Sequence, residues 1–311
     1  MPEDSDNSAA EAKYLGRIRE CLPHLVIETV RANRDGLTND VLIVNERLVF
    51  RFPKNETWAR DLLANEVKVI QLARNHLDVQ IPQVEYQAAD FVAFRFIEGS
   101  ALQRNDILVL DENGQDAIAH QLATYLKQLH GIPREEVERQ QIASSDTNRD
   151  YRVWVRLYED VRRELFPTLM PHAREWVTNH FTPLLDNEGL MDYEPRLING
   201  DTAPYHLLFD KQARRLSGII DFGTAGLGDP AADFATIIYF YGETFLRRMA
   251  KYYPAIRDGL DRARFWAGTL ELQWALSGFR GRRAHWSWFT VHLGSARDVL
   301  PIGTVWDKEQ E

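Results

Sequence analysis

The spacing of apolar residues changes once along the chain, near Gly99, and this change limits the folds that the chain can adopt. Before Gly99, short apolar runs such as 41–44 and 48–52 are separated by turn residues, here 45–46. Such runs are typical of antiparallel strands, and one helical pattern at 57–74 interrupts them. After Gly99 the apolar residues follow helical spacing over 115–131, 150–166, 171–186, 231–252 and 255–280.

This division predicts an α+β protein with two lobes. Residues 1–98 would form a small β-rich N-terminal lobe, and residues 99–311 a larger helical lobe. The first lobe is also expected to contain a disordered polar tail at 1–10, a helix at 11–21, and strands at 24–32, 83–90 and 91–99. In the second lobe only 196–199, 205–210 and 215–222 are expected to be extended. A length of 311 residues, 44% of them hydrophobic, suits two domains with buried cores.

The composition excludes several classes of function. A net charge of −9 argues against nucleic acid as the main partner and is compatible with a cationic substrate. No run of apolar residues is long enough to span a membrane, so no membrane partner is expected. The single cysteine, Cys21, excludes an intramolecular disulfide and a cysteine-based metal cluster. The acidic start of the chain does not fit a secretory signal, and we expect a cytoplasmic protein.

Three polar side chains lie at the ends of short apolar runs in the second lobe: Asp201, His206 and Asp221. Phosphoryl transfer needs a carboxylate that orients or deprotonates the accepting hydroxyl, ligands for a divalent cation, and a cation near the phosphates. Asp201 suits the first role, and Asp221, followed by Phe222 and Gly223, suits the second. An isolated aspartate after glycine is usually a turn residue, so the interpretation rests on the combination of both aspartates behind a β-rich lobe.

The loop Asn-Gly-Asp at 199–201, followed by His206 and by Asp-Phe-Gly at 221–223, resembles the aminoglycoside phosphotransferases and the related macrolide phosphotransferases. The resemblance covers about residues 24–280 and is strongest at 197–234. It is nearest to the 2″-aminoglycoside and macrolide branches, which also have histidine at the position of His206. The family's usual histidine before Gly-Asp is replaced here by Asn199, which we expect to support the loop.

The resemblance implies a protein-kinase-like fold and transfer of the γ-phosphoryl of ATP or GTP, with Mg²⁺, to a hydroxyl of a small molecule. An aminoglycoside-type antibiotic is the expected acceptor. By resemblance Asp201 is the catalytic residue, whereas His206 and Asp221 hold the metal. Magnesium prefers oxygen ligands, so His206 is expected to bind it weakly or through water, and its alternative role is to cap the loop by hydrogen bonding.

The resemblance also places the nucleotide. Arg51 stands where the family has its phosphate-binding lysine, and its expected partner is Glu66. Arginine can contact phosphates through two N–H groups but does not replace lysine without consequence. Lys54 is the alternative cation, and the alternative for Glu66 is a solvated helix residue.

The purine is expected to bind the backbone of the connection between the lobes, at Arg95, Phe96 and Ile97. The loop 34–39, which contains Gly36, would lie over the phosphates. The alternative is that this loop is a plain hairpin turn.

Substrate recognition is expected from Glu243, Glu271 and Trp274 in the C-terminal helices. Glu271 and Trp274 are three residues apart and so share a helix face. A carboxylate beside an aromatic ring suits an ammonium group on a sugar. Alternatively, Trp274 is a core residue and Glu271 a surface one.

Two rival functions remain open at this point. One is a kinase for a macrolide or another small metabolite on the same fold. The other is a catalytically silent nucleotide-binding module, which the replacements at Arg51 and Asn199 suggest.

Overall fold

The structure is a computed structural model that describes residues 3–34, 36, 38–54, 57–145, 150–280 and 302–306, and the side chains from residue 10 onwards within these ranges.

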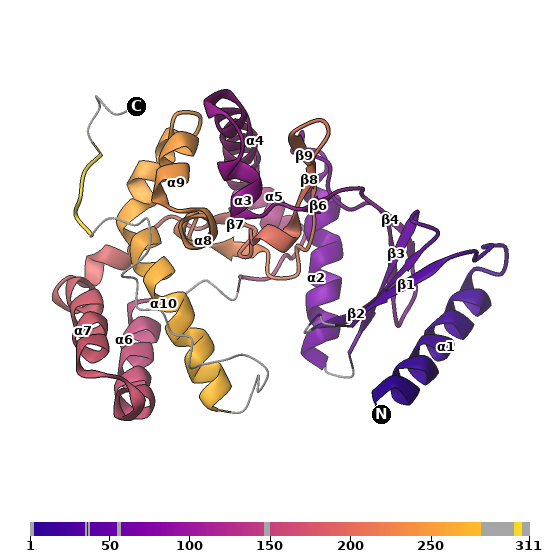
Figure 1. The fold of residues 1–311 in the computed structure, drawn as a ribbon, viewed down its shortest axis with the longest axis horizontal. Helices are drawn as coiled ribbons and strands as arrows, with labels where there is room; N and C mark the ends of the chain where they lie inside the picture. Colours follow the sequence, from indigo (N-terminus) through magenta and orange to yellow (C-terminus); the bar gives the residue numbers. More distant parts are fainter. Residues whose placement is uncertain are drawn as a thin grey trace.

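Five strands near the N-terminus form one antiparallel sheet in the order β1-β2-β3-β5-β4 (Figure 1). They are β1 (Val30–Asn33), β2 (Asn39–Val44), β3 (Leu48–Pro53), β4 (Val84–Gln87) and β5 (Val92–Arg95). Between β2 and β3, Asn45 and Glu46 have φ angles of 54° and 49°. Two successive positive φ angles are typical of the tight two-residue hairpin turn. The turn predicted at 45–46 is therefore confirmed.

A helix packs on each face of this sheet. Side chains alternate between the two faces along β3, as they do in any strand. Phe50 and Phe52 lie in a cluster with α1 (Glu3–Cys21), whereas Arg51 points to the opposite face and reaches α2 (Thr57–Ala73). Figure 1 shows α1 outermost and α2 between the sheet and the rest of the molecule. The period of two in β3 thus directs Arg51 toward the C-terminal lobe.

The C-terminal lobe consists of helices around short strands. Its helices are α3 (Arg104–Leu108), α4 (Glu112–His130), α5 (Arg134–Arg139), α6 (Tyr151–Asp160), α7 (Pro171–Asp186), α8 (Ala231–Tyr241), α9 (Glu243–Ala250) and α10 (Leu260–Phe279). Its strands are β6 (Ser100–Ala101), β7 (Arg196–Ile198), β8 (Leu207–Asp210), β9 (Arg215–Ile219) and β10 (Gly226–Gly228). They form one sheet of β6-β8-β9 and one of β10-β7.

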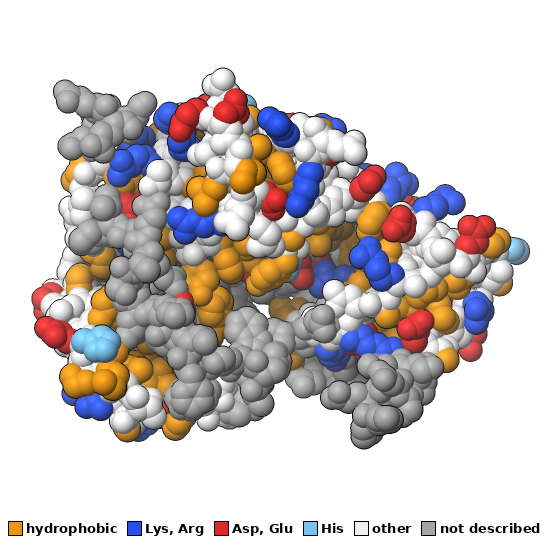
Figure 2. Space-filling view, in the orientation of Figure 1, with side chains coloured by type: hydrophobic (Ala, Val, Ile, Leu, Met, Phe, Trp, Pro, Cys, Tyr) orange, Lys and Arg blue, Asp and Glu red, His pale blue; other side chains and the backbone are white. Residues whose placement is uncertain are grey.

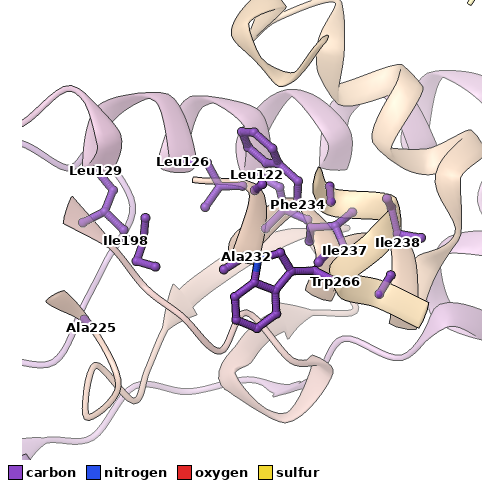
Figure 3. Packing of buried hydrophobic residues seen from close by; sticks show 14 of the residues in the cluster. Leu122, Leu126, Leu129, Ile198, Ala225, Ala232, Phe234, Ile237, Ile238 and Trp266 are labelled. Carbon is purple, nitrogen blue, oxygen red and sulfur yellow. The ribbon is translucent and has the colours of Figure 1, made fainter. Parts of the chain in front are cut away.

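The core of this lobe lies between α4, α8 and α10. Figure 3 shows Leu122 and Leu126 of α4 facing Phe234 and Ile237 of α8, with Trp266 of α10 beside them. All five side chains are buried. Where α4 and α8 meet, the end of α4 and the start of α8 lie next to the loop that follows β7.

The chain passes from the sheet to the second lobe directly after β5. The first strand beyond this connection, β6, pairs with β8 through Ser100 and Phe209, which belong to the C-terminal part. We propose that the lobes meet between residues 98 and 99, at the boundary predicted from the sequence.

Two predictions for the N-terminal lobe were wrong. The tail expected at 1–10 is helical from Glu3, since α1 begins eight residues before the start of the helix predicted at 11–21. Residues 1 and 2 lie outside the described residues. The strand expected at 24–32 is limited to β1, Val30–Asn33, since only these residues pair with β2.

Several helices are shorter than predicted. The helix expected at 231–252 is divided into α8 and α9 at Gly242, whose φ of 92° is incompatible with a continuous helix. The region 255–280 begins with a 3₁₀ turn at Pro254–Gly259 before α10. The helix expected at 150–166 ends at Asp160 and continues as a π turn, Val161–Leu165. The short elements α3, α5, β6 and β10 were not predicted.

Charges are mixed on the surface. In Figure 2, Lys and Arg side chains are interspersed with Asp and Glu over this face. None of the helices in the described ranges is long and apolar enough to cross a membrane.

Gly226 lies where the segments 143–145 and 225–227 pack closely against each other. A Cβ added at Gly226 would lie 2.3 Å from the carbonyl oxygen of Ala143 and 2.6 Å from the backbone nitrogen of Ser145. Because both atoms are backbone, Gly226→Ala should lower the free energy of unfolding by about 2–3 kcal/mol, measured by urea denaturation. The matched control is Gly16→Ala in α1, where an added Cβ would meet no atom of the described residues within 4 Å beyond the neighbouring backbone of its own helix. The control should be neutral or stabilising by up to about 1 kcal/mol. Equal effects of the two variants would contradict the close approach.

Candidate active site

The loop after β7 is held by one buried carboxylate. Asp233, in the first turn of α8, accepts hydrogen bonds from the backbone N–H groups of Asn199 at 3.0 Å and Gly200 at 2.7 Å. His130, at the end of α4, donates its Nε2–H to the same carboxylate at 3.0 Å. Gly200 has a φ of 79°, a conformation that glycine adopts readily. Asp233 therefore orders the loop that carries Asp201.

Asp201, His206 and Asp221 lie together. His206 Nδ1 is 2.9 Å from the carbonyl oxygen of Asp201 and 3.6 Å from its carboxylate oxygen Oδ2. On the other side of the ring, His206 Nε2 is 3.5 Å from Asp221 Oδ2. The side chain of Asp201 is 35% exposed, so this carboxylate is accessible to a ligand. The structure thus brings together the three residues predicted for catalysis and metal binding.

Asp221 adopts an unusual backbone conformation. Its φ is 64°, in the left-handed region that non-glycine residues seldom occupy. The carboxylate is held from two directions, by the N–H of Gly223 and by Arg51, each at 3.2 Å. Such strain persists only where the surroundings enforce it, and it often marks a functional residue.

Arg51 joins Asp221 to helix α2. Its Nη1 lies 2.6 Å from Glu66 Oε1, and its Nη2 lies 3.2 Å from Asp221 Oδ2. Glu66 is 1% exposed, and its Oε1 also accepts the N–H of Phe222 at 3.2 Å. The pair expected from the sequence is therefore in contact, although its role toward a nucleotide stays a prediction.

Burial and the charge of Arg51 shift the pKa values of Glu66 and Asp221 in opposite directions. Burial raises the pKa of Glu66 to about 7, against the charge of Arg51, which pulls it down. Burial would also raise the pKa of Asp221, but the charge of Arg51 and the N–H of Gly223 oppose it and hold this pKa below its ordinary value. Asp221 is therefore an ionised carboxylate at neutral pH and is suited to a cation.

The donor atoms fit a magnesium ion that is bound together with phosphate. A carbonyl oxygen can only accept, so His206 Nδ1 must donate its proton to Asp201. In the neutral ring Nε2 is then an acceptor that lies beside the Asp221 carboxylate, so His206 and Asp221 are the residues that would hold a cation. No group of three or more His, Cys, Asp or Glu side chains among the described residues forms a metal site by itself. Magnesium commonly takes one or two protein carboxylates and completes its shell with phosphate oxygens and water.

The connection between the lobes is partly occupied by its own hydrogen bonds. The N–H of Arg95 donates to Gln83 and that of Phe96 to Arg47, each at 2.9 Å. The side chain of Arg95 is 57% exposed and pairs with Glu85 at the surface. A purine contact would therefore depend on Ile97 and on carbonyl groups of the connection. Neither N–H of Arg95 or Phe96 is available for it.

The loop around Gly36 is held by Lys54. The Lys54 ammonium donates to the carbonyl oxygens of Arg34 at 3.0 Å and Gly36 at 2.5 Å. Residues 35 and 37 lie outside the described residues. Because Lys54 is engaged with this loop, Arg51 is the better candidate for the phosphate-binding cation.

Glu243 does not lie where a substrate carboxylate is needed. It is 1% exposed and pairs with Arg264, whose Nη2 is 2.5 Å from Glu243 Oε1. Trp306 also donates its indole N–H to this oxygen at 2.9 Å. The predicted role of Glu243 in substrate binding is therefore corrected: the buried pair joins α9 to α10 and to the segment 302–306.

Glu271 and Trp274 share a neighbour that the sequence analysis missed. Both are half-buried, and Tyr239 of α8 contacts both: its hydroxyl donates to Glu271 at 3.1 Å, and its ring lies edge-on to Trp274 at 5.1 Å.

A row of rings connects this pair to the loop that carries Asp201 and His206. The ring centroids are 4.9 Å apart for Tyr239 and Phe240, 6.4 Å for Phe240 and Tyr205, and 4.5 Å for Tyr205 and His206. The signal in the sequence was the run Tyr-Phe-Tyr at 239–241, just before Glu243. Glu271 and Trp274 are thus linked to the site through contiguous aromatic side chains.

The fold and the site together define a class of protein. A small antiparallel lobe contributes the Arg51–Glu66 pair, and a helical lobe contributes Asp201, His206 and Asp221. This arrangement is that of a kinase-like phosphotransferase. Residues 29–266 match the model of the phosphotransferase enzyme family, and the chain belongs to this family.

Relatives and solved structures agree with this assignment. Viomycin phosphotransferase of Streptomyces vinaceus is 31% identical over 183 residues, which make up 58% of this chain and 61% of that protein, less than two thirds of its length. The GDP complex of aminoglycoside 2′-phosphotransferase-IIIa is 27% identical with a TM-score of 0.80, over 90% of this chain and 94% of that one. The streptomycin–ATP–APH(2″)-IIa ternary complex is 25% identical with a TM-score of 0.68, over 85% of this chain and 90% of that one. The predicted family, kinase-like fold and class of enzyme are confirmed.

The bonds of Asp233 lead to a prediction about stability. In Asp233→Asn, an amide N–H₂ would replace one acceptor and face a backbone N–H, which would lose its partner. The free energy of unfolding should fall by about 2–3 kcal/mol, measured by urea denaturation. The exposed Asp258→Asn is the matched control and should stay within about 0.5 kcal/mol of the parent protein. A negligible effect of Asp233→Asn would mean that the loop does not depend on this carboxylate.

Proposed function

We propose that the protein transfers the γ-phosphoryl group of ATP or GTP to a hydroxyl of a small cationic antibiotic of the aminoglycoside type. The observation that carries this proposal is the meeting of Asp201, His206 and Asp221 beside a buried Arg51–Glu66 pair. This set supplies each part that phosphoryl transfer requires: a carboxylate for the acceptor, ligands for a divalent cation, and a cation for the phosphates.

Asp201 acts on the acceptor. Its exposed carboxylate orients the acceptor hydroxyl and takes its proton as the hydroxyl oxygen bonds to the γ-phosphorus. The bond from the γ-phosphorus to the β–γ bridging oxygen breaks, and the nucleoside diphosphate leaves. His206 donates to the Asp201 carbonyl and so keeps the loop in place during the reaction.

Asp221, Arg51 and Glu66 act on the donor. Asp221 would hold Mg²⁺ with His206 at its side, and Mg²⁺ supplies positive charge that offsets the charge of the triphosphate. Arg51 binds the phosphates, and Glu66 orients its guanidinium. The connection at Ile97 would contact the base, and the loop containing Gly36 would cover the phosphates.

The substrate class rests on charge and on the relatives. Glu271 and Trp274 meet at Tyr239 and offer a carboxylate beside aromatic rings, which suits an ammonium group. The net charge of −9 also favours a cationic ligand. A viomycin phosphotransferase and a streptomycin-bound relative among the similar proteins support an antibiotic acceptor. The intact site argues against a silent module.

The first test is a substrate panel with a catalytic variant. Release of nucleoside diphosphate from ATP and from GTP, with magnesium, is followed across viomycin, several aminoglycosides and macrolides. We expect a response to one cationic class, and Asp201→Asn should lower kcat by about 10²–10⁴-fold, because the amide cannot accept the hydroxyl proton.

The control for this test is Asp192→Asn, an exposed position in the same lobe, which should keep full turnover. Unchanged turnover in Asp201→Asn would exclude the proposed role of this residue.

A second prediction concerns the acceptor. Glu271→Gln keeps the size of the side chain and an oxygen for the Tyr239 hydroxyl but removes the charge. KM for the cationic acceptor should rise by about tenfold, while KM for the nucleotide stays unchanged. The exposed Glu175→Gln on α7 serves as a control for loss of charge alone. An equal rise in both variants would point to the overall charge of the protein instead of a contact at Glu271.

A further inference from the structure

Asn65, which precedes Glu66 on α2, contacts two separate segments of the C-terminal lobe. Its Nδ2 donates to the carbonyl oxygen of Ala225 at 2.9 Å. Its Oδ1 accepts the backbone N–H of Ala143 at 2.9 Å. A single side-chain amide thus uses both its donor and its acceptor to join the N-terminal lobe to the C-terminal lobe.

The two segments that Asn65 contacts already pair with each other. The N–H of Ser145 donates to Leu227 at 2.9 Å, and the N–H of Leu227 donates to Ala143 at 3.3 Å. The absence of a side chain at Gly226 allows them to approach closely. The amide of Asn65 extends this ladder by one further rung, which ties α2 to a rigid part of the C-terminal lobe.

One of these segments continues directly from the metal-binding aspartate. The N–H of Ala225 donates to the carbonyl oxygen of Phe222 at 3.1 Å, which closes a turn immediately after Asp221. Glu66 accepts the N–H of Phe222 at the start of this turn, and Asn65 donates to Ala225 at its end. Neighbouring residues of α2 therefore hold both ends of the same turn.

The Arg51–Glu66 pair needs this support. Glu66 Oε2 and Arg51 Nε are both buried, and neither has a hydrogen-bond partner among the residues that the structure describes. A buried ion pair whose remaining donor and acceptor atoms lack hydrogen bonds is costly in free energy. It depends on the surrounding structure to keep its geometry. The hydrogen bonds of Asn65 supply a fixed position for α2 that does not rely on the pair itself.

We propose that Asn65 is a positioning residue of the phosphotransferase. It holds α2 so that Glu66 orients Arg51 toward the phosphates and the Phe222–Ala225 turn presents Asp221 to the metal. The proposal rests on the proposed function for its role in turnover. Its effect on nucleotide binding can be measured without an acceptor.

The test compares three variants of the full chain. Asn65→Ala removes both hydrogen bonds while keeping a residue that favours helix. Asn65→Asp keeps the acceptor for Ala143 but places a carboxylate oxygen against the carbonyl of Ala225. Lys68→Ala is the matched control: Lys68 lies one turn further along α2 and also reaches the C-terminal lobe, at the carbonyl of Gln141 at 3.1 Å, but does not contact the turn after Asp221.

The first readout is the Kd of ADP and of GDP in the presence of magnesium, by calorimetry. Asn65→Ala and Asn65→Asp should each raise the Kd of the nucleotide that binds by about tenfold, because α2 must be reordered on binding. Lys68→Ala should stay within about twofold of the parent protein. In turnover, KM for the nucleoside triphosphate should rise in the Asn65 variants while KM for the acceptor does not change.

The second readout is hydrogen exchange of the segment 141–145. The Ala143 amide should exchange faster in Asn65→Ala and remain protected in Asn65→Asp, which keeps its acceptor.

Parent-like nucleotide affinity in both Asn65 variants would overturn the proposal, and so would an equal loss of affinity in Lys68→Ala. If no antibiotic is phosphorylated but the Asn65 variants still bind nucleotide more weakly, the proposed function fails while the positioning role of Asn65 stands.

Discussion

The guanidinium of Arg51 is the contact on which the arrangement of the site depends. It joins a strand of the small sheet to Glu66 on α2 and to Asp221 in the C-terminal lobe, residues that are far apart in the sequence. The alternation of side chains in β3 explains its direction, since Phe50 and Phe52 take the opposite face against α1. A planar cation with several N–H groups can contact both carboxylates at once, which a lysine ammonium does less well. The replacement of the family's lysine by arginine is therefore compatible with the rest of the site.

Two buried carboxylates, those of Asp233 and Glu66, hold the backbone of the site in place. Asp233 binds the backbone at Asn199 and Gly200, and the turn after Asp221 is held by α2. Both are local backbone arrangements that would be unstable in isolation, because each exposes N–H groups that need a partner. Their partners come from elements distant in the sequence: α8 for the loop that carries Asp201, and α2 for the turn after Asp221. Of the two, only the turn after Asp221 therefore depends on the packing of the N-terminal lobe against the C-terminal lobe.

The side of the site proposed for the acceptor is built differently from the side proposed for the nucleotide. The residues proposed to contact the donor are charged, with Glu66 buried and Arg51 and Asp221 half-buried, whereas those near Glu271 are mostly aromatic and half-buried. Rings that extend from Tyr205 to Trp274 form a continuous wall between the catalytic loop and α10. Aromatic side chains arranged in this way favour apolar faces and cationic groups of a ligand. The carboxylate of Glu271 would add a preference for positive charge.

The sequence by itself determined the two-lobe α+β fold and the family, because these depend on local spacing and on a short motif. It also pointed to Asp201, His206 and Asp221, which the structure brings together. It also indicated the Arg51–Glu66 pair. Only the tertiary structure decided the partners of the acidic residues predicted to bind substrate: Glu243 is buried against Arg264, whereas the half-buried Glu271 accepts from Tyr239. It also revealed Asn65, whose partners lie at Ala143 and Ala225. The physical reason is that burial and hydrogen-bond partners across long separations in the chain follow from packing, which no local pattern of residues records.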